Sequence, residues 1–289
     1  STNVEDRRGM GIPGLGGGGM KVGLGGLVIA LIASLLFGID PTEILTGGGS
    51  APVPQPPPPG YGPQTSAPAP GTPAKGDTAG EMMRAVLGDT EDVWKALFES
   101  AGQRAYRPPN LVLFDGRVNS ACGFASAAVG PFYCPGDRKL YLDTAFFNDL
   151  ARRFGAPGDF AAAYVVAHEV GHHVQNLLGT MQQFDSQMGR LDPRARNQMQ
   201  VRLELQADCY AGVWGYFAQK RNRLEPGDLE EGMRAAAAVG DDMIMKRTQG
   251  YVVPDAFTHG SAEQRVRWFR KGLSSGDPRQ CDTFSVQQP

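Results

Sequence analysis

Two histidines one helical turn apart are the residues best suited to chemistry. His168 and His172 lie in the run AHEVGHH, inside a segment whose small and apolar residues predict a helix over residues 161–178. Side chains four apart project from one face of a helix, so the two imidazoles supply half of a tetrahedral zinc site. Glu169 is displaced around that helix. Zinc lowers the pKa of a bound water to about 7, and Glu169 could take its proton as the water attacks a peptide carbonyl.

A third protein ligand is available downstream. Glu204 and Asp208 lie four apart in an otherwise apolar part of a helix expected over residues 194–221. Carboxylates among apolar neighbours are costly unless they are paired or bind a metal. We therefore expect Glu204 to be the third ligand and Asp208 to accept a hydrogen bond from a ligand histidine. The alternative is that both face solvent and pair with Arg196 or Arg202.

The other two histidines have weaker signals. His173 points about 100° away from His172 on a regular helix and cannot share its metal, so a structural role is favoured, with a substrate-side role as the alternative. His259 lies in a loop before the last predicted helix. An imidazole there could donate to a developing oxyanion, but the spacing alone favours an ordinary loop residue.

Cysteine usage points to an oxidising compartment. The chain has four cysteines and no CxxC pair, which suits two disulfides rather than a cysteine zinc site. Cys122 could pair with Cys134 across a hairpin-like loop, and Cys209 with Cys281 would then tie a helix to the C-terminal tail. Four free buried thiols are the alternative.

The elements that must position these residues form an α+β pattern. Besides the two helices above, we expect a helix over residues 81–100, a strand over 111–114, a hairpin with strands at 132–134 and 139–142, and helices over 228–246 and 262–272. Gly179 suits the position that ends the histidine-bearing helix. Gly171 would let another element approach that helix closely. A helix, a small sheet and then further helices indicate one α+β domain over residues 81–289.

The N-terminal third has a different composition. Residues 1–21 are polar and glycine-rich, and we expect a disordered cytoplasmic tail. Residues 22–39 carry no charge over 18 residues, which favours a transmembrane anchor, with a cleaved signal peptide as the alternative. Residues 40–80 are rich in proline and glycine and are expected to be a linker. Arg7, Arg8 and Lys21 precede the apolar run, so the positive-inside rule places the domain outside the cytoplasmic membrane.

Charge argues against a nucleic-acid partner. The 28 basic and 30 acidic side chains of the 289-residue chain nearly balance, and no basic patch stands out.

Four segments together resemble the neutral zinc metallopeptidases of the YpfJ type. They are CGFASAAVGPFYCPGDRKLYLD from Cys122, AYVVAHEVGHHVQNLLG from Ala163, RLELQADCYAGVW from Arg202 and FTHGSAEQRVRWF from Phe257. The likeness runs from about Ala79 to Phe284. The Glu204-x-x-Ala207-Asp208 pattern is also similar to the third-ligand motif of gluzincins. The resemblance implies that His259 and Arg265, six residues apart, lie near the catalytic centre, with His259 as an oxyanion or substrate-positioning group.

These observations predict a membrane-anchored, zincin-like metallopeptidase that hydrolyses peptides or proteins outside the membrane. One Zn²⁺ per chain would be held by His168, His172 and Glu204, with Glu169 as general base. An extended substrate would lie against the edge of the small sheet near residues 132–142. The alternative is a non-catalytic binding or scaffold module with a structural zinc ion, which would normally need four protein ligands.

Overall fold

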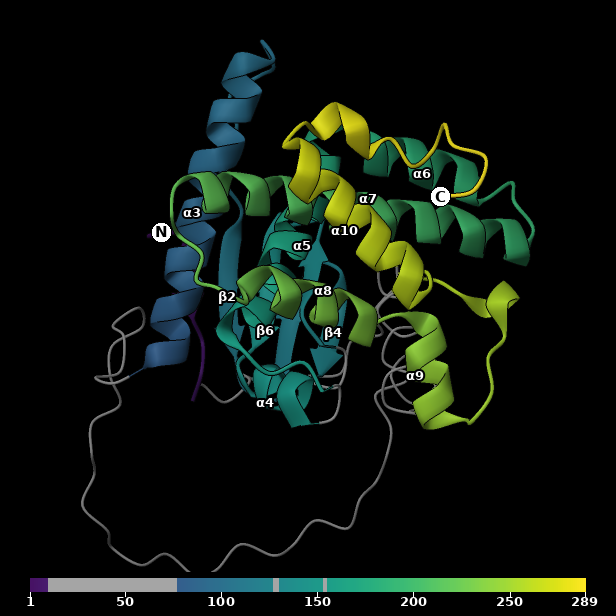
Figure 1. Ribbon diagram of the computed structural model, residues 1–289, viewed down its shortest axis with the longest axis horizontal. Coiled ribbons are helices and arrows are strands. Elements are labelled where there is room, and N and C mark those ends of the chain that lie inside the picture. The colour runs from purple at the N-terminus through teal and green to yellow at the C-terminus, as the bar shows by residue number, and fades with distance from the viewer. Residues whose placement is uncertain (10–76, 127–129, 153–154) are drawn as a thin grey trace, which may run out of the picture.

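The computed structural model describes residues 1–9, 77–126, 130–152 and 155–289, which form a mixed α+β fold that is mostly helical (Figure 1). Its strands are β1 (Val4–Asp6), β2 (Asn110–Phe114), β3 (Arg117–Ser120), β4 (Gly123–Ser126), β5 (Phe132–Cys134) and β6 (Lys139–Asp143). Its helices are α3 (Thr78–Ser100), α4 (Ala145–Arg152), α5 (Asp159–Leu178), α6 (Thr180–Met188), α7 (Pro193–Lys220), α8 (Asp228–Ala238), α9 (Asp241–Thr248) and α10 (Ala262–Ser275), with 3-10 turns η2 (Pro254–Ala256) and η3 (Pro278–Cys281). The predicted α+β class is confirmed.

The main sheet separates two packing layers. Its strand order is β1-β2-β6-β5, with β5 antiparallel to β6 and the other pairs parallel. Alternate residues of a strand face opposite sides. Leu111 and Leu113 accordingly belong to the core shared with the helices, whereas Val112 and Phe114 pack in a cluster with the β3–β4 hairpin. The predicted hairpin over residues 132–142 is confirmed as β5 and β6.

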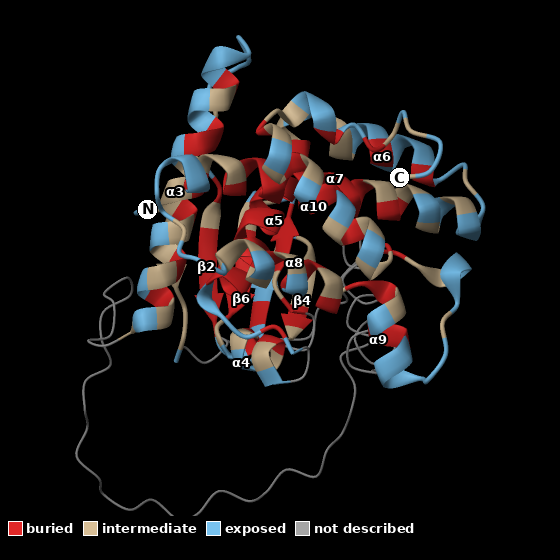
Figure 2. Cartoon of the chain, viewed as in Figure 1, coloured by how far each residue is buried: buried red, intermediate tan, exposed pale blue. Residues whose placement is uncertain are grey.

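Helix α5 is the centre of the molecule. All its residues from Phe160 to Gln175 are buried, which Figure 2 shows as an almost continuous red helix. It packs against α3, α7 and α8 and against β5. Gly179 ends it in the left-handed region at φ 84°, as its position predicted. A helix that is buried on all sides by other elements is held in place by them, so α5 is a rigid base for the histidines.

Residues 1–9 are part of the domain, and the expectation of a disordered tail is wrong for them. Strand β1 pairs with β2, with Val4 opposite Leu111. The Ser1 ammonium donates to the Arg84 carbonyl of α3 at 2.8 Å, and the Arg8 guanidinium binds the Asp77 carboxylate at the start of α3. The domain therefore includes residues 1–9 and begins its first helix at Thr78, not near residue 81.

This pairing also corrects the expected topology. A tail inside the cell and a domain outside cannot share one sheet, so residues 1–9 lie on the same side of any membrane as the domain. The expected anchor at residues 22–39 and most of the expected linker lie outside the described residues. Within the ranges that are described, no helix is both long enough and apolar enough to cross a membrane.

A second correction concerns residues 228–246, expected as one helix. The structure divides them into α8 and α9, with Gly240 in an extended conformation at φ −69° and ψ 141°. A Cβ on Gly240 would lie 2.3 Å from the Ala262 backbone nitrogen, so the close approach of the α10 N-terminus requires glycine there. The break makes Asp241 the first residue of a new helix.

Both predicted disulfides are present. Cys122–Cys134 ties the β3–β4 turn to β5, and Cys209–Cys281 ties α7 to η3. No free cysteine remains, so the alternative of four thiols is wrong.

Candidate metal centre

Helices α5 and α7 bring three ligand-type side chains together. The ligand atoms of His168, His172 and Glu204 lie within 4.8 Å of one another, and all three residues are buried. The His168 Nε2 is 3.2 Å from Glu204 Oε2, and the His172 Nε2 is 3.5 Å from Glu204 Oε1. Gly171 permits this approach, because a Cβ there would lie 2.9 Å from the Ala207 carbonyl oxygen of α7. The close approach expected at Gly171 is thus observed.

The ring nitrogen of His168 that faces away from Glu204, Nδ1, lies in a network of buried charged groups. Its Nδ1 is 2.8 Å from Asp208 Oδ1. Arg265 donates two hydrogen bonds to the same carboxylate, from Nε to Oδ2 at 2.8 Å and from Nη2 to Oδ1 at 2.9 Å. The Tyr164 hydroxyl also donates to this carboxylate. Asp208 and Arg265 therefore lie directly behind the metal site. Glu204 and Asp208 are buried and do not face solvent, so that alternative is wrong.

The outer nitrogen of His172 is held by a neutral amide. The His172 Nδ1 is 2.9 Å from Gln175 Oε1. Because Asp208 and the amide oxygen of Gln175 are acceptors, each ring keeps a proton on Nδ1, and Nε2, the nitrogen nearer Glu204, is the one that can lose its proton and bind a metal. A deprotonated Nε2 that faces a carboxylate needs a cation between the two. The donor set therefore fits a metal ion, and two imidazoles with one carboxylate are typical zinc ligands.

The pKa shifts of Glu204 and His168 also suit a site for a cation. Burial raises the pKa of Glu204, but His172 and His168 outweigh it and hold this pKa well below its usual value. Burial lowers the pKa of His168, yet Asp208 and Glu204 raise it to about 9. The buried carboxylates therefore favour a positive charge at this position, either a proton on His168 or a metal ion that replaces it. The carboxyl group of Glu169 is buried beside the ligands, and burial raises its pKa.

A loop before α10 adds His259. Gly260 packs against Val201 and Leu205, on either side of Glu204 along α7, and the charge of Glu204 acts on His259. The His259 Nδ1 is 3.0 Å from Asp241 Oδ1. Burial lowers the pKa of His259, but the nearby Asp241 carboxylate has the larger effect, so the pKa of His259 is raised. The loop that carries His259 therefore packs against the part of α7 that carries Glu204, and the oxyanion role that the resemblance implies stays a prediction.

Comparison with known proteins decides the family. Residues 1–284 match the family model described as "Putative neutral zinc metallopeptidase". The chain belongs to this family. The Escherichia coli (strain K12) relative "Uncharacterized protein YpfJ" is 43% identical over 98% of this chain and 96% of its own length. The Mycobacterium tuberculosis (strain H37Rv) relative "Uncharacterized protein Rv2575" is 48% identical over 67% of both chains. No solved structure shows a significant match.

The remaining histidine, His173, makes hydrogen bonds that connect parts of the fold, which agrees with the structural role favoured from the sequence. The His173 Nε2 donates to the Arg107 carbonyl at 2.7 Å, and its Nδ1 accepts from the Tyr133 hydroxyl at 3.0 Å. Burial lowers the pKa of His173 to about 4, so the ring is neutral. These bonds connect α5 to β5 and to the segment before β2.

Sequence reasoning missed three residues around the metal centre, namely Tyr164, Gln175 and Asp241. Gln175 follows His172 by three positions, a spacing at which side chains meet on a helix, so it could have been found. Asp241 carried a weaker signal, the run Gly240-Asp241-Asp242, which is typical of one helix ending and another beginning. Nothing in the sequence connects Tyr164 with Asp208.

Proposed function

We propose that the chain is a zinc-dependent peptidase with a zincin-like active site, in which His168, His172 and Glu204 bind one Zn²⁺. The observation that carries the proposal is the convergence of these three ligand groups from two crossing helices, with each histidine held by an acceptor behind it. Three protein ligands leave a coordination position for water or substrate, which is typical of catalytic zinc sites. Zinc bound there would polarise a substrate carbonyl and activate water.

The chain's own residues would move the proton and stabilise charge. Glu169 lies next to the first ligand, and its buried carboxylate would take a proton from the attacking water and pass it to the leaving amine. His259, held by Asp241, would donate from Nε2 to the developing oxyanion. Arg265 would act indirectly, since it holds the carboxylate that orients His168.

Peptide or protein substrates fit the sheet. Strand β5 is an edge strand of the main sheet and contacts α5, which carries the histidines. An extended peptide can add to such an edge through backbone hydrogen bonds. The two disulfides support an extracytoplasmic location, because disulfides persist in oxidising compartments. Anchoring through residues 22–39 would require a route that returns the chain to the same side.

The rival proposal is a binding or scaffold module with structural zinc. It needs a fourth protein ligand, whereas the histidine-containing group found in the described ranges has three members. It also gives Glu169 no task. The second cluster of potential ligands, Asp159, Asp228 and Glu231, contains only carboxylates and is partly exposed, which favours no zinc site.

The deciding experiment uses the full chain, because residues 1–9 belong to the fold. Wild type should bind one zinc per chain and cleave members of a peptide library, and chelator should stop cleavage. His168→Ala and His172→Ala should lose the zinc, and Glu204→Ala should bind it more weakly. Glu169→Gln should keep the zinc and lose roughly 100- to 10,000-fold in kcat.

Glu99→Gln is the matched control, since Glu99 is exposed on α3. Normal peptidase activity in the Glu169→Gln protein would reject the mechanism. A zinc-loaded wild type that cleaves no peptide would favour the scaffold module.

A further inference from the structure

The two histidines of the metal centre are supported in different ways. His168 is backed by the buried Asp208–Arg265 ion pair. His172 is backed by Gln175, whose side chain is neutral and fully buried. A primary amide has one accepting and one donating end. The support of His172 therefore depends on which way the amide points, and neighbouring groups must determine that.

Gln175 is oriented by two acceptors on its nitrogen side. Its Nε2 donates to the Leu203 carbonyl at 2.7 Å and to Gln206 Oε1 at 3.1 Å. Turning the amide over would place its oxygen against two other oxygens and its nitrogen against the Nδ1–H of His172. The observed orientation keeps the Gln175 oxygen on His172, and with it the Nε2 lone pair on the metal side.

Gln206 is oriented in turn by the C-terminal tail. Its Nε2 donates to the Cys281 carbonyl at 3.0 Å. A carbonyl can only accept, so this bond fixes the Gln206 oxygen towards Gln175. The series of groups His172, Gln175, Gln206 and the Cys281 carbonyl, here called the amide relay, thus has one direction throughout and ends on the backbone of a cystine.

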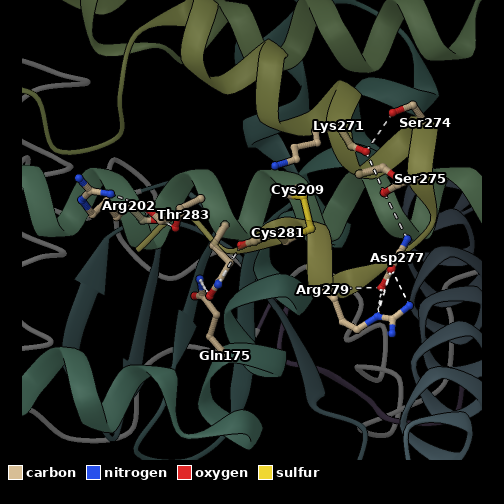
Figure 3. Close-up of a disulfide and its surroundings, with 12 residues drawn as sticks. Gln175, Arg202, Cys209, Lys271, Ser274, Ser275, Asp277, Arg279, Cys281 and Thr283 are labelled. Atoms are coloured by element: carbon tan, nitrogen blue, oxygen red, sulfur yellow. Dashed lines mark hydrogen bonds and ion pairs between the residues drawn. A yellow bond between two sulfur atoms is a disulfide. The ribbon is translucent and has the colours of Figure 1, made fainter. Parts of the chain in front are cut away.

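The Cys209–Cys281 disulfide is what holds the end of the relay in place. Cys209 lies on α7, three residues after Gln206, and Cys281 is completely buried against it (Figure 3). Arg202 holds the tail beyond this point through the carbonyls of Thr283 and Val286. Figure 3 shows Gln175 directly beneath the segment of the C-terminal tail that runs from Cys281 to Thr283.

We propose that the Cys209–Cys281 disulfide positions His172 for metal binding, through the Cys281 carbonyl, Gln206 and Gln175. Gln175 and Gln206 are positioning residues and do not touch the metal or the substrate. Outer partners of ligand histidines fix ring orientation and typically contribute about 10- to 100-fold in metal affinity. The inference rests on the proposed zinc site, and it makes full zinc affinity depend on an intact C-terminal disulfide.

The test measures zinc affinity by competition with a chromophoric chelator. Four full-length proteins are compared: wild type, Gln206→Met, the Cys209→Ala/Cys281→Ala double variant and their combination. Methionine keeps the length of glutamine and removes both hydrogen bonds of the Gln206 side-chain amide. Gln206→Met and the disulfide variant should each weaken zinc binding by about 10-fold. Because they interrupt one series of contacts, the combination should weaken it no further than the larger single effect.

Cys122→Ala/Cys134→Ala is the matched control, because it removes the other disulfide, which lies on the β3–β4 side of the sheet. Its zinc affinity should equal that of wild type. Near-ultraviolet circular dichroism of the metal-free proteins checks folding, and Gln206→Met, which keeps both disulfides, carries the test if the disulfide variant does not fold.

Three results would overturn the relay: wild-type affinity in Gln206→Met, additive losses in the combination, or an equal loss in the control. A wild-type protein that binds no zinc would instead reject the proposed function itself.

Discussion

Asp241 is the residue whose role was least expected. Its carboxylate is completely buried at the start of α9. Its Oδ2 accepts the backbone N–H groups of Thr258, His259 and Gly260, and its Oδ1 lies 3.0 Å from His259 Nδ1. One carboxylate therefore fixes both the backbone of the loop and the ring it carries. With Nδ1 occupied, Nε2 is the nitrogen that His259 can offer to a substrate.

The first prediction at this scale concerns His259→Phe, which keeps the bulk of the ring and removes the donor. If His259 supports the oxyanion, kcat and kcat/KM should fall together by about 100- to 1000-fold, because the interaction forms only in the transition state. Peptide kinetics measure the loss, and metal analysis should find zinc unchanged. Activity within about threefold of wild type, far from the usual cost of losing such a donor, would return His259 to the class of ordinary loop residues.

The sequence predicted the residues of the candidate metal site better than most of their hydrogen-bond partners. His168, His172 and Glu204 follow from helical spacing and from the cost of burying a carboxylate, and both arguments are local. Gln206 and Asp241 gain their roles only when the C-terminal tail and the loop before α10 fold onto α7 and α9. A glutamine or an aspartate in a helix has many possible partners, so sequence spacing alone could not select these.

At the scale of elements, the crossing of α5 over α7 determines how far Glu204 lies from the two histidines of the candidate metal site. The crossing occurs at Gly171 and Ala207, next to His172 on one helix and three residues after Glu204 on the other. Helix periodicity predicted both helices almost to their ends, Leu178 and Lys220. It did not predict α4, α6 or the division of α8 from α9, because short helices leave a weak periodic signal.

Gly171→Ala should widen this crossing. Its Cβ would lie 2.9 Å from the Ala207 carbonyl oxygen and 3.1 Å from Ala207 Cα, and backbone atoms cannot rotate away. We expect a loss of about 1–3 kcal/mol in the free energy of unfolding. Zinc affinity should also fall, since α7 moves Glu204 away from the histidines. Denaturant unfolding and zinc competition measure the two effects.

Gly189→Ala is the comparison, because Gly189 has φ −65° and a Cβ there would meet no atom within 4 Å. It should be neutral or slightly stabilising. Unchanged stability in Gly171→Ala would show that the helices can separate at little cost.

On the scale of the whole molecule, the described segments on either side of residues 10–76 meet each other. Residue 9 follows β1 and residue 77 precedes α3, and Arg8 bonds directly to Asp77. Hydropathy analysis treats residues 22–39 as an independent segment and cannot detect that the residues before it pair with a strand about 100 positions later. The pairing of Val4–Asp6 with β2 is long-range, and three residues give no periodic signal of their own.

Labelling can test this arrangement, because the native cysteines are all in disulfides. Thr2→Cys and Glu99→Cys introduce single thiols at exposed positions of the N-terminal segment and of α3. In intact cells, a membrane-impermeant maleimide should label both or neither, and after permeabilisation it should label both. A cell in which only Glu99→Cys reacts would place the two ends of the domain on opposite sides of the membrane and contradict the β1–β2 pairing.

The pairing of β1 with β2 also matters for the design of shortened forms of the chain. A fragment starting at Thr78 would keep every residue of the metal site but would lose the strand that covers one side of β2. Strand β2 contains four buried residues in succession, Leu111 to Phe114, and the backbone N–H and C=O groups on its β1 side would then be unpaired. An open, apolar sheet edge is a template for aggregation. Insolubility of such a fragment would therefore reflect a missing neighbour strand and not an unstable helical core.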